Sequence, residues 1–219
     1  MRHVVWDWNG TLLDDLPLVV ESVNVLMYER ELTPITAADY TAHYTRPVRV
    51  FYERLFGRPV LDDEWAHVDA MFHDHYDAHV AASARLMDGA REAMGSVARA
   101  GRTQSLLSMY QHEQLVPLVE RFGITDRFTE IQGLTGPGGG HKQPHLEFHL
   151  ALEAHLHAAD DPSQVLIIGD TLDDARAARH IGAQAVLLAS GSAPRSVLET
   201  AGVPVVDTLA EALEAGGLV

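Results

Sequence analysis

The chain has 219 residues, of which 47% are hydrophobic and 21% are charged, a composition typical of a folded globular protein. Its formal net charge of −15 argues against nucleic acid or an anionic membrane surface as the main partner, since both reward clustered Lys and Arg. It contains no cysteine, which excludes disulfides, thiolate metal sites and cysteine nucleophiles.

No stretch approaches the ~20 apolar residues that a membrane-spanning helix needs. The opening residues MRHVVWDWNG contain no long apolar run ahead of their first charges, so we expect no secretory signal. We therefore expect a cytoplasmic protein without a membrane or nucleic-acid partner. Small anionic ligands stay open, because a bound cation can reverse the local field.

Short apolar strands and helical patterns alternate along most of the sequence. The first strand, 2–6, ends at Asp7 and the turn signal Asn9-Gly10. Four more strands are predicted, at 103–107, 129–133, 164–168 and 184–189. Helical patterns lie between them, at 88–100, 112–122 and 174–181, and each runs into a glycine, a common helix stop. This alternation predicts an α/β fold with a Rossmann-like parallel sheet covered on both faces.

Residues 15–86 interrupt the alternation. They contain no convincing strand and several helical stretches, at roughly 16–31, 37–45, 47–56 and 62–84. We predict that 15–86 form an all-helical cap domain inserted into an α/β core domain made of 1–14 and 87–219.

Polar residues follow the predicted strands at their carboxyl ends, the edge at which open parallel sheets bind ligands. Asp7 comes directly after the first strand. Gly10 permits a tight turn, which would bring its own backbone amide and that of Thr11 near an anion. The alternative is an ordinary strand end before an Asn-Gly turn.

An acidic cluster follows the strand 164–168. Asp170, Asp173 and Asp174 lie within five positions, and their mutual repulsion is costly unless a cation lies among them. Mg²⁺ takes a few carboxylates and shares the phosphate of a substrate, which suits this cluster. Helix N-capping by Asp173 or Asp174 is the alternative interpretation, and it leaves Asp170 unexplained.

Two further polar residues fit an anion site. Ser108 follows the strand 103–107, where its hydroxyl would donate to a phosphoryl oxygen. Lys142 is the only lysine beside fifteen arginines, and its ammonium would neutralise charge on both Asp7 and a phosphoryl group. Alone, a serine at a strand end or a lysine in a loop is commonplace.

With these features in order, the chain resembles the haloacid dehalogenase-like superfamily of phosphohydrolases. The resemblance rests on four segments: the apolar strand with Asp7-x-x-Gly10-Thr11, Ser108, Lys142, and Gly169-Asp170-x-x-x-Asp174. The chain looks like the subgroup with a helical cap after the first motif, which includes phosphoglycolate phosphatases and β-phosphoglucomutases. The family's sheet order implies that Asp7 and Asp170 converge.

The resemblance also implies a mechanism for a small phosphorylated substrate. Asp7 would attack phosphorus in line and form an aspartyl-phosphate that water hydrolyses. Mg²⁺ would bind Asp7, the carbonyl of Asn9 and Asp170, and Asp174 would complete the metal shell or orient Lys142. Gly10, Thr11, Ser108 and Lys142 would hold the remaining phosphoryl oxygens.

The sequence departs from the family pattern at Asn9. Family phosphatases usually carry an Asp there, which protonates the leaving group and then activates water, and an amide can do neither. Losing one general acid/base typically costs about 10²–10⁴-fold in rate.

Three hypotheses follow from Asn9. The chain hydrolyses substrates with good leaving groups, such as acyl phosphates or phosphoanhydrides. Alternatively, a cap histidine supplies the proton, or the chain binds phosphorylated ligands with little turnover. The candidate cap histidines are His43, His67, His73, His75 and His79.

Related chemistries fit less well. Phosphonoacetaldehyde hydrolases use a cap lysine, and residues 15–86 contain none. Haloacid dehalogenases lack the acidic pair that Asp170 and Asp174 provide. A response-regulator receiver carries its acidic pair on the first strand and has no helical insert, so both the motif order and the cap disagree with it.

Substrate choice would lie in the predicted cap. Arg46 and Arg49 are candidates for binding a second anionic group of the substrate, and the alternative is an exposed helix start. His141, His145 and His149 recur at i, i+4 spacing, but with a helix predicted only from Leu146 we interpret them as surface residues rather than a metal face.

Overall fold

The computed structural model describes residues 2–45, 47–136, 141–157 and 161–218, with 152–157 described by their backbone. The chain divides into two compact units. The first contains Met1–Asp14, Leu86–Gly191 and Arg195–Val219, and the second contains Asp15–Arg85 with Ser192–Pro194. The second unit therefore interrupts the first after Asp14.

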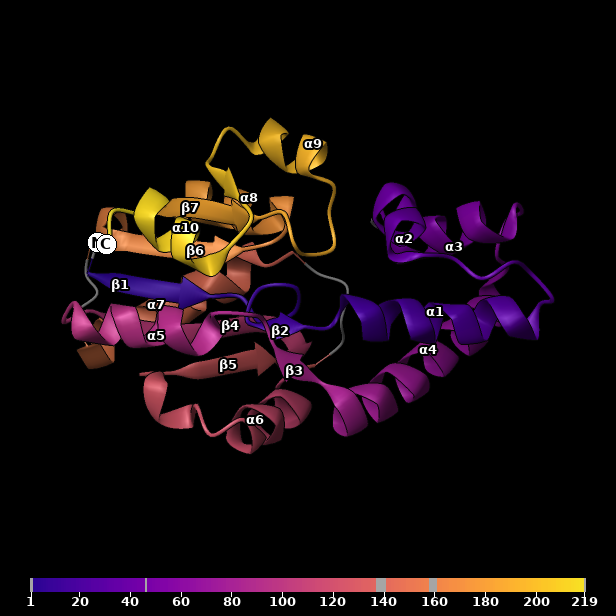
Figure 1. Cartoon of the computed structure of the whole chain (residues 1–219), viewed down its shortest axis with the longest axis horizontal. Helices are drawn as coiled ribbons and strands as arrows, with labels where there is room; N and C mark the ends of the chain where they lie inside the picture. The colour runs from indigo at the N-terminus through magenta and orange to yellow at the C-terminus, as the bar shows by residue number, and fades with distance from the viewer. Residues whose placement is uncertain (1, 46, 137–140, 158–160, 219) are drawn as a thin grey trace. The chain divides into compact units, whose positions relative to one another are not determined.

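The first unit is built on a six-stranded sheet with the order β5-β4-β1-β6-β7-β8 (Figure 1). Its strands are β1 (His3–Trp6), β4 (Thr103–Gln111), β5 (Ile131–Leu134), β6 (Val165–Gly169), β7 (Gln184–Leu188) and β8 (Val205–Val206). All neighbouring pairs are parallel. Every residue of β1 and β6 is buried, as expected for central strands of a parallel sheet covered on both faces.

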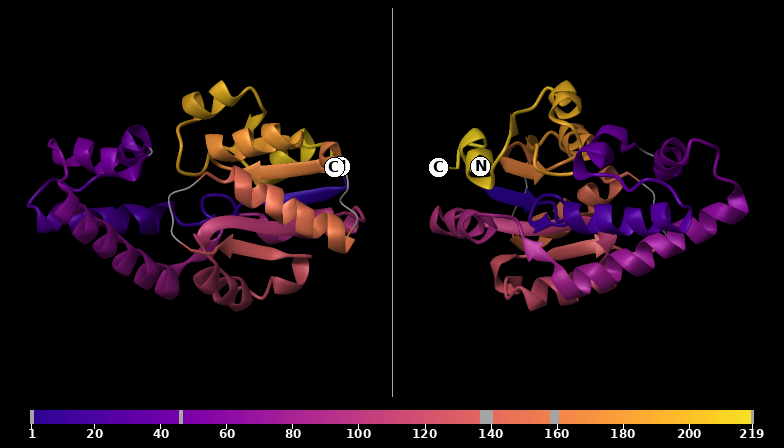
Figure 2. Two further views of the ribbon diagram at one scale, coloured as in Figure 1. Left: turned by 180° about the vertical axis from the view of Figure 1, so that it is seen from behind. Right: turned by 45° about the vertical axis from the view of Figure 1, so that its right-hand side comes forward.

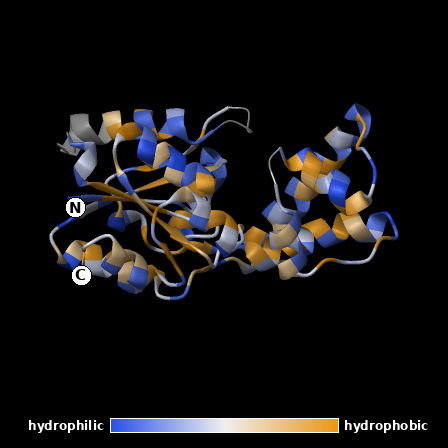
Figure 3. Ribbon diagram, turned by 90° about the horizontal axis from the view of Figure 1, so that it is seen from above, coloured by the Kyte–Doolittle hydropathy of each residue, from blue (hydrophilic) through white to orange (hydrophobic). Residues whose placement is uncertain are grey.

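Helices cover both faces of this sheet. Helices α5 (Ala90–Arg99) and α10 (Leu209–Ala215) pack against each other on one face, and α7 (Gln143–His157) and α8 (Leu172–Ile181) do so on the other (Figures 1 and 2). Helix α6 (His112–Arg121) packs against β4 and β5. The hydropathy colouring places the apolar strands between these helices (Figure 3). The predicted α/β class with a parallel sheet is confirmed.

The second unit is helical and has its own apolar core. Its helices are α1 (Leu16–Glu29), α2 (Ala37–His43), α3 (Val48–Phe56) and α4 (Asp62–Ser83). Helices α1 and α4 pack along each other, and a core cluster that includes Leu26, Phe51 and Val68 is almost fully buried. None of the helices in the described ranges is both long and apolar enough to span a membrane.

The predicted element boundaries shift by a few residues. Strand β4 runs on to Gln111 rather than ending at 107, and β5 begins at Ile131 rather than at 129. The sequence did not predict the two-residue strands β2 (Leu13–Asp14) and β3 (Arg85–Leu86), nor β8, α9 (Arg195–Leu198) and α10. Such short elements carry too few periods for a hydrophobic pattern to emerge.

Candidate active site

The carboxyl ends of β1, β4 and β6 meet at one edge of the sheet. Trp6, the last residue of β1, pairs with Leu106 of β4 and with Ile168 of β6. The amide of Asp7 then donates to the carbonyl of Ile168 at 2.8 Å. This register brings Asp7 to the same edge as Ser108 and Asp170, where open α/β sheets bind ligands.

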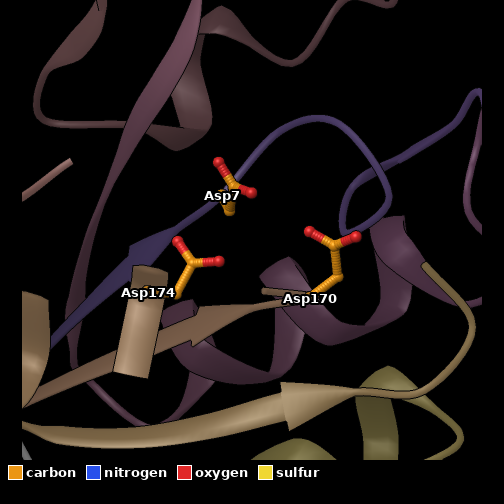
Figure 4. Close-up of side chains that lie close together, drawn as sticks. All are labelled: Asp7, Asp170 and Asp174. Carbon is orange, nitrogen blue, oxygen red and sulfur yellow. The ribbon is translucent and has the colours of Figure 1, made fainter. Parts of the chain in front are cut away.

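Three carboxylates converge at this edge. Asp7, Asp170 and Asp174 each offer one oxygen, and these oxygens lie within 4.8 Å of one another. Figure 4 shows them approaching from the end of β1, the end of β6 and the first turn of α8. The three residues are 9%, 2% and 1% exposed. Three buried carboxylates this close repel one another strongly, so the cluster favours cations.

Lys142 supplies one of those positive charges. Its Nζ donates to Asp7 Oδ1 at 2.6 Å and to Asp174 Oδ1 at 2.7 Å. The residue is 3% exposed, so both bonds are shielded from water. The only lysine of the chain thus bridges two of the three carboxylates of the cluster.

Burial and charge shift the pKa values of these groups in different directions. Burial raises the pKa of Asp7 to about 6, against the opposing effect of Lys142. Burial also disfavours the charge of Asp174, but Lys142 and hydrogen bonds from Thr171 outweigh it and lower the pKa of that carboxyl. Asp174 and Asp7 likewise overcome the burial of Lys142 and raise its pKa. A further cation beside Asp7 would lower its pKa and favour the ionised carboxylate.

Asp174 also caps helix α8. Its Oδ2 accepts from the amide of Thr171 at 3.0 Å and from the Thr171 hydroxyl at 2.6 Å, while the hydroxyl accepts from the Asp174 amide. This is a capping box. The capping and functional interpretations of the sequence therefore apply to different oxygens of one carboxylate. A Cβ on Gly169 would lie 2.3 Å from the Asp174 Cγ, so only glycine permits this packing.

Two glycines enclose Asp170. A Cβ on Gly10 would lie 2.4 Å from Asp170 Oδ2, and one on Gly191 would lie 2.1 Å from the same atom. Gly10 also has a φ of 68°, a conformation that L-residues rarely adopt. Sequence analysis identified Gly10 and missed Gly191, whose signal is a glycine shortly after a predicted strand.

Asp173 holds the segment that carries Lys142. Its Oδ2 accepts from the Lys142 amide at 2.7 Å, and its Oδ1 lies 3.3 Å from His141 Nδ1. The sequence offers Asp173 as a member of the acidic cluster or as a helix cap, and it does not predict the contact with the Lys142 segment. The capping box uses Thr171 and Asp174 instead, which leaves Asp173 to anchor the start of α7.

Ser108 and Asn9 lie beside each other. The Ser108 hydroxyl donates to Asn9 Oδ1 at 3.5 Å and accepts from the Tyr110 amide at 2.9 Å. Ser108 is 2% exposed and lies inside β4 rather than after its end. The Thr11 hydroxyl is buried and has no hydrogen-bond partner in the described part of the chain.

Of the two arginines predicted for substrate binding, the structure describes only Arg49. Arg46 lies outside the described residues. Within the second unit, Arg49 Nε donates to the Val60 carbonyl at 2.9 Å and its Nη1 to Asp62 at 2.6 Å. A role for either arginine in substrate binding therefore stays a prediction.

Most of the candidate histidines of the second unit lie near acceptors of that unit. His67 lies 2.8 Å from Glu29, His73 lies 3.7 Å from Asp69 and His79 lies 3.8 Å from Glu21. His43 Nδ1 lies 3.1 Å from the carbonyl of Asp39, and the ring of His75 lies 6.3 Å from that of His79.

The interpretation of His149 as a surface residue is wrong. Helix α7 begins at Gln143 rather than near Leu146. His149 lies on the helix face that also buries Leu146 and Leu150, and it is fully buried. His141, by contrast, is exposed, and His145 is half-buried.

A parallel α/β sheet that gathers a buried aspartate, a lysine and an acidic pair at its carboxyl edge fits a hydrolase. The chain belongs to the haloacid dehalogenase-like hydrolase family, whose model matches residues 1–182. Its predicted membership of this superfamily and its assignment as an enzyme are thereby confirmed.

The chain is similar to phosphoglycolate phosphatases from several bacteria. The one from Mesorhizobium japonicum is 27% identical over 199 residues, which cover 90% of this chain and 86% of the relative. The one from Escherichia coli is 26% identical over 211 residues, with 87% and 82% covered.

Solved structures share the fold over the whole chain. A crystal structure of a putative phosphoglycolate phosphatase from Lactobacillus delbrueckii subsp. bulgaricus has a TM-score of 0.81 at 18% identity, covering 100% of this chain and 99% of that one. A predicted phosphoglycolate phosphatase from Haemophilus somnus has a TM-score of 0.78 at 20% identity, with 99% and 98% covered.

Proposed function

We propose that this protein is a magnesium-dependent phosphohydrolase that acts on a small phosphorylated metabolite through an aspartyl-phosphate on Asp7. The observation that carries the proposal is the bridge from Lys142 to Asp7 and Asp174, with Asp170 close by. One ammonium cannot neutralise three buried carboxylates, so the cluster has the charge to take a divalent cation as well.

The donor set fits Mg²⁺. The ion prefers oxygen ligands and keeps several waters, and Asp7, Asp170 and the carbonyl of Asn9 would supply the protein oxygens, with Asp174 beside them. When bound, the ion would offset negative charge as the carboxylate and the phosphoryl group approach.

Different residues of the chain would attack phosphorus and bind the phosphoryl oxygens. A carboxylate oxygen of Asp7 would form the bond to phosphorus while the bond from phosphorus to the leaving oxygen breaks. Lys142, the Ser108 hydroxyl and the amides of Gly10 and Thr11 would bind the non-bridging oxygens. Water would then hydrolyse the aspartyl-phosphate and release inorganic phosphate.

Asn9 limits which leaving groups this site serves. An amide neither protonates an alkoxide nor deprotonates water, so we propose slow turnover or a preference for acyl phosphates and phosphoanhydrides. The hypothesis that a histidine of the predicted cap supplies the proton is an alternative to this preference. The alternative function, binding of phosphorylated ligands with little turnover, rests on the same residue.

The relatives named phosphoglycolate phosphatase support a small phosphorylated carboxylic acid as one substrate class. Such an ester has an alkoxide leaving group, which needs a proton. Phosphoglycolate is therefore the substrate on which Asn9 should reduce turnover most.

The test is a magnesium-dependent release of phosphate, measured across alkyl phosphates, acyl phosphates and anhydrides. Wild type, Asp7→Asn and Asn9→Asp would be compared. We expect Asp7→Asn to abolish release, and Asn9→Asp to raise turnover of alkyl phosphates by about 10²-fold or more, with little gain on acyl phosphates.

Hydrolysis that survives in Asp7→Asn would refute the proposed nucleophile. No hydrolysis in wild type, together with retained phosphate binding, would favour the binding alternative.

A further inference from the structure

Five polar side chains form a continuous chain of hydrogen bonds through the interior of the first unit. Thr103 Oγ1 lies 2.8 Å from His3 Nδ1, and His3 Nε2 lies 2.8 Å from Ser105 Oγ. Ser105 Oγ lies 2.7 Å from His149 Nε2, and His149 Nδ1 lies 2.9 Å from Gln132 Oε1. His3, Ser105 and His149 are buried. This series of hydrogen bonds thus ties β1, β4 and β5 to helix α7.

The chemistry of its end group fixes the direction of this chain. Gln132 Oε1 can only accept, so His149 Nδ1 donates to it. His149 Nε2 then accepts the Ser105 hydroxyl proton, because burial lowers the pKa of His149 to about 3 and keeps the ring neutral. Ser105 Oγ in turn accepts from His3 Nε2. At the far end, Thr103 Oγ1 lies 2.8 Å from His3 Nδ1 and 3.4 Å from the Arg2 carbonyl. Each bond from Gln132 to His3 therefore has one donor and one acceptor.

Helix α7 and strand β1 also carry the two partners of the active-site ion pair, Lys142 and Asp7. The carbonyl of Lys142 accepts from the Leu146 amide at 2.9 Å, so Lys142 opens helix α7. His149 follows seven residues later, about two helical turns, and so lies on nearly the same face. On the sheet side, His3 lies in β1, the strand that ends just before Asp7.

Directional bonds hold a helix more tightly than apolar packing does. Leu146 and Leu150 also bury α7, but hydrophobic contact is non-directional and tolerates small shifts. A slide of one residue along α7 would move Lys142 by about 1.5 Å, enough to break its bonds to Asp7 and Asp174. Asp173 anchors the near end of the helix, and His149 anchors it two turns further on.

We infer that His149 is a positioning residue for Lys142, acting through Ser105 and His3 to hold α7 at the height and rotation at which the ammonium bridges Asp7 and Asp174. The effect on turnover rests on the proposed function, whereas the placement of Lys142 does not.

The single lysine makes the test selective. Protein labelled with ¹⁵N-lysine gives one side-chain ammonium signal, that of Lys142, and its shift and its rate of exchange with water report the ion pair directly. We would compare wild type with His149→Leu, which fills the space without bonds, and with His149→Gln, whose amide oxygen can still accept from Ser105. Leu150→Ala is the control that removes packing from α7 and leaves the hydrogen-bond chain intact.

We expect His149→Leu to shift the ammonium signal and speed its exchange, and to lower kcat by about tenfold or more with a smaller change in KM. His149→Gln should restore most of both. Leu150→Ala should lower stability while leaving the signal in place. If His149→Leu does not fold, Ser105→Ala breaks the same chain from the sheet side and should shift the signal as well.

An unchanged ammonium signal in folded His149→Leu or Ser105→Ala would overturn the inference and leave His149 a purely structural residue. A shifted signal in an enzyme without hydrolysis in any variant, wild type included, would support the inference and count against the proposed function.

Discussion

The Asp170 carboxylate lies against two backbone segments, and each comes so close that its residue there can carry no side chain. Gly10 and Gly191 approach it from the loops after β1 and β7, and a Cβ at either position would overlap its carboxylate. These two glycine backbones therefore restrict where the Asp170 carboxylate can lie. Fixed oxygens favour a small cation that requires a defined geometry, as Mg²⁺ does.

This arrangement predicts that Gly191→Ala weakens magnesium binding by about tenfold or more, because second-layer changes of this kind typically cost 10–100-fold in metal affinity. Gly191 does not have a positive φ, so the backbone accepts alanine and the Asp170 side chain has to move. Isothermal titration with Mg²⁺ would measure the effect. Gly101→Ala is the control: its Cβ would meet open space, and it should lower stability but leave affinity unchanged. Equal magnesium affinity in Gly191→Ala and wild type would show that Asp170 binds no metal.

At the scale of single residues, sequence reasoning works where chemistry follows a strand end. Asp7, Lys142, Asp170 and Asp174 were selected for that reason, and the structure brings them together. The contact of Asp173 with the Lys142 amide and the role of Gly191 are not predicted, because both depend on which residue lies next to them across the fold. Nothing in the local sequence carries that information.

Helix α7 depends on polar bonds in its buried face, which makes its attachment sensitive to acid. The pKa of His149 is lowered from 6.5 to about 3, chiefly by burial, with further contributions from His3 and Lys142. Between these two pH values the unfolded chain binds a proton at this site that the folded chain does not. Stability from the neutral ring is therefore complete above pH 6.5 and is lost as the pH falls towards 3.

We predict that wild type loses roughly 2 kcal/mol more unfolding free energy than His149→Gln between pH 6.5 and pH 4.5, since each pH unit contributes up to ~1.4 kcal/mol. Urea unfolding followed by circular dichroism at several pH values would measure both slopes. The two proteins share every titrating group except His149, so the difference between their slopes reports this residue alone. Parallel slopes would mean that another group, not His149, dominates acid unfolding.

At the scale of elements, sequence reasoning placed the long strands and helices and erred at their ends. It began α7 near Leu146, past Pro144, whereas the helix starts at Gln143. Proline is well tolerated in a first turn. The signal for the burial of His149 is its i, i+3 and i, i+1 spacing to the buried Leu146 and Leu150. The short elements β8 and α10 are not predicted because their formation depends on the strands and helices against which they pack, β7 among them.

Each of the two compact units has its own buried core. The second unit leaves the first after Asp14 and returns at Leu86. Next to this junction, the amide of Met87 donates to the carbonyl of Leu12 at 2.8 Å. The two ends of the first unit are therefore already adjacent, and a short turn could join them.

We predict that replacing 15–85 with a short glycine-containing turn leaves a first unit that folds cooperatively, with lower stability because it is smaller. Circular dichroism, thermal unfolding and the lysine ammonium signal would establish the fold and the ion pair. A separate 15–85 chain should be helical, since it keeps the cluster around Phe51 and Val68. A collapsed product without a cooperative transition would show that the units fold only together.

The lone lysine has a practical consequence for handling this protein. Reagents that modify amines react with the neutral form of an accessible side chain, and Lys142 is buried and held as an ammonium between two carboxylates. Fifteen arginines carry all other side-chain cationic charge apart from histidine, so such reagents find no lysine on the surface. Fluorophores, surfaces and cross-linkers should therefore attach through the terminal amine alone, giving a uniform orientation. Slow labelling at Lys142 would then report how often the active site opens.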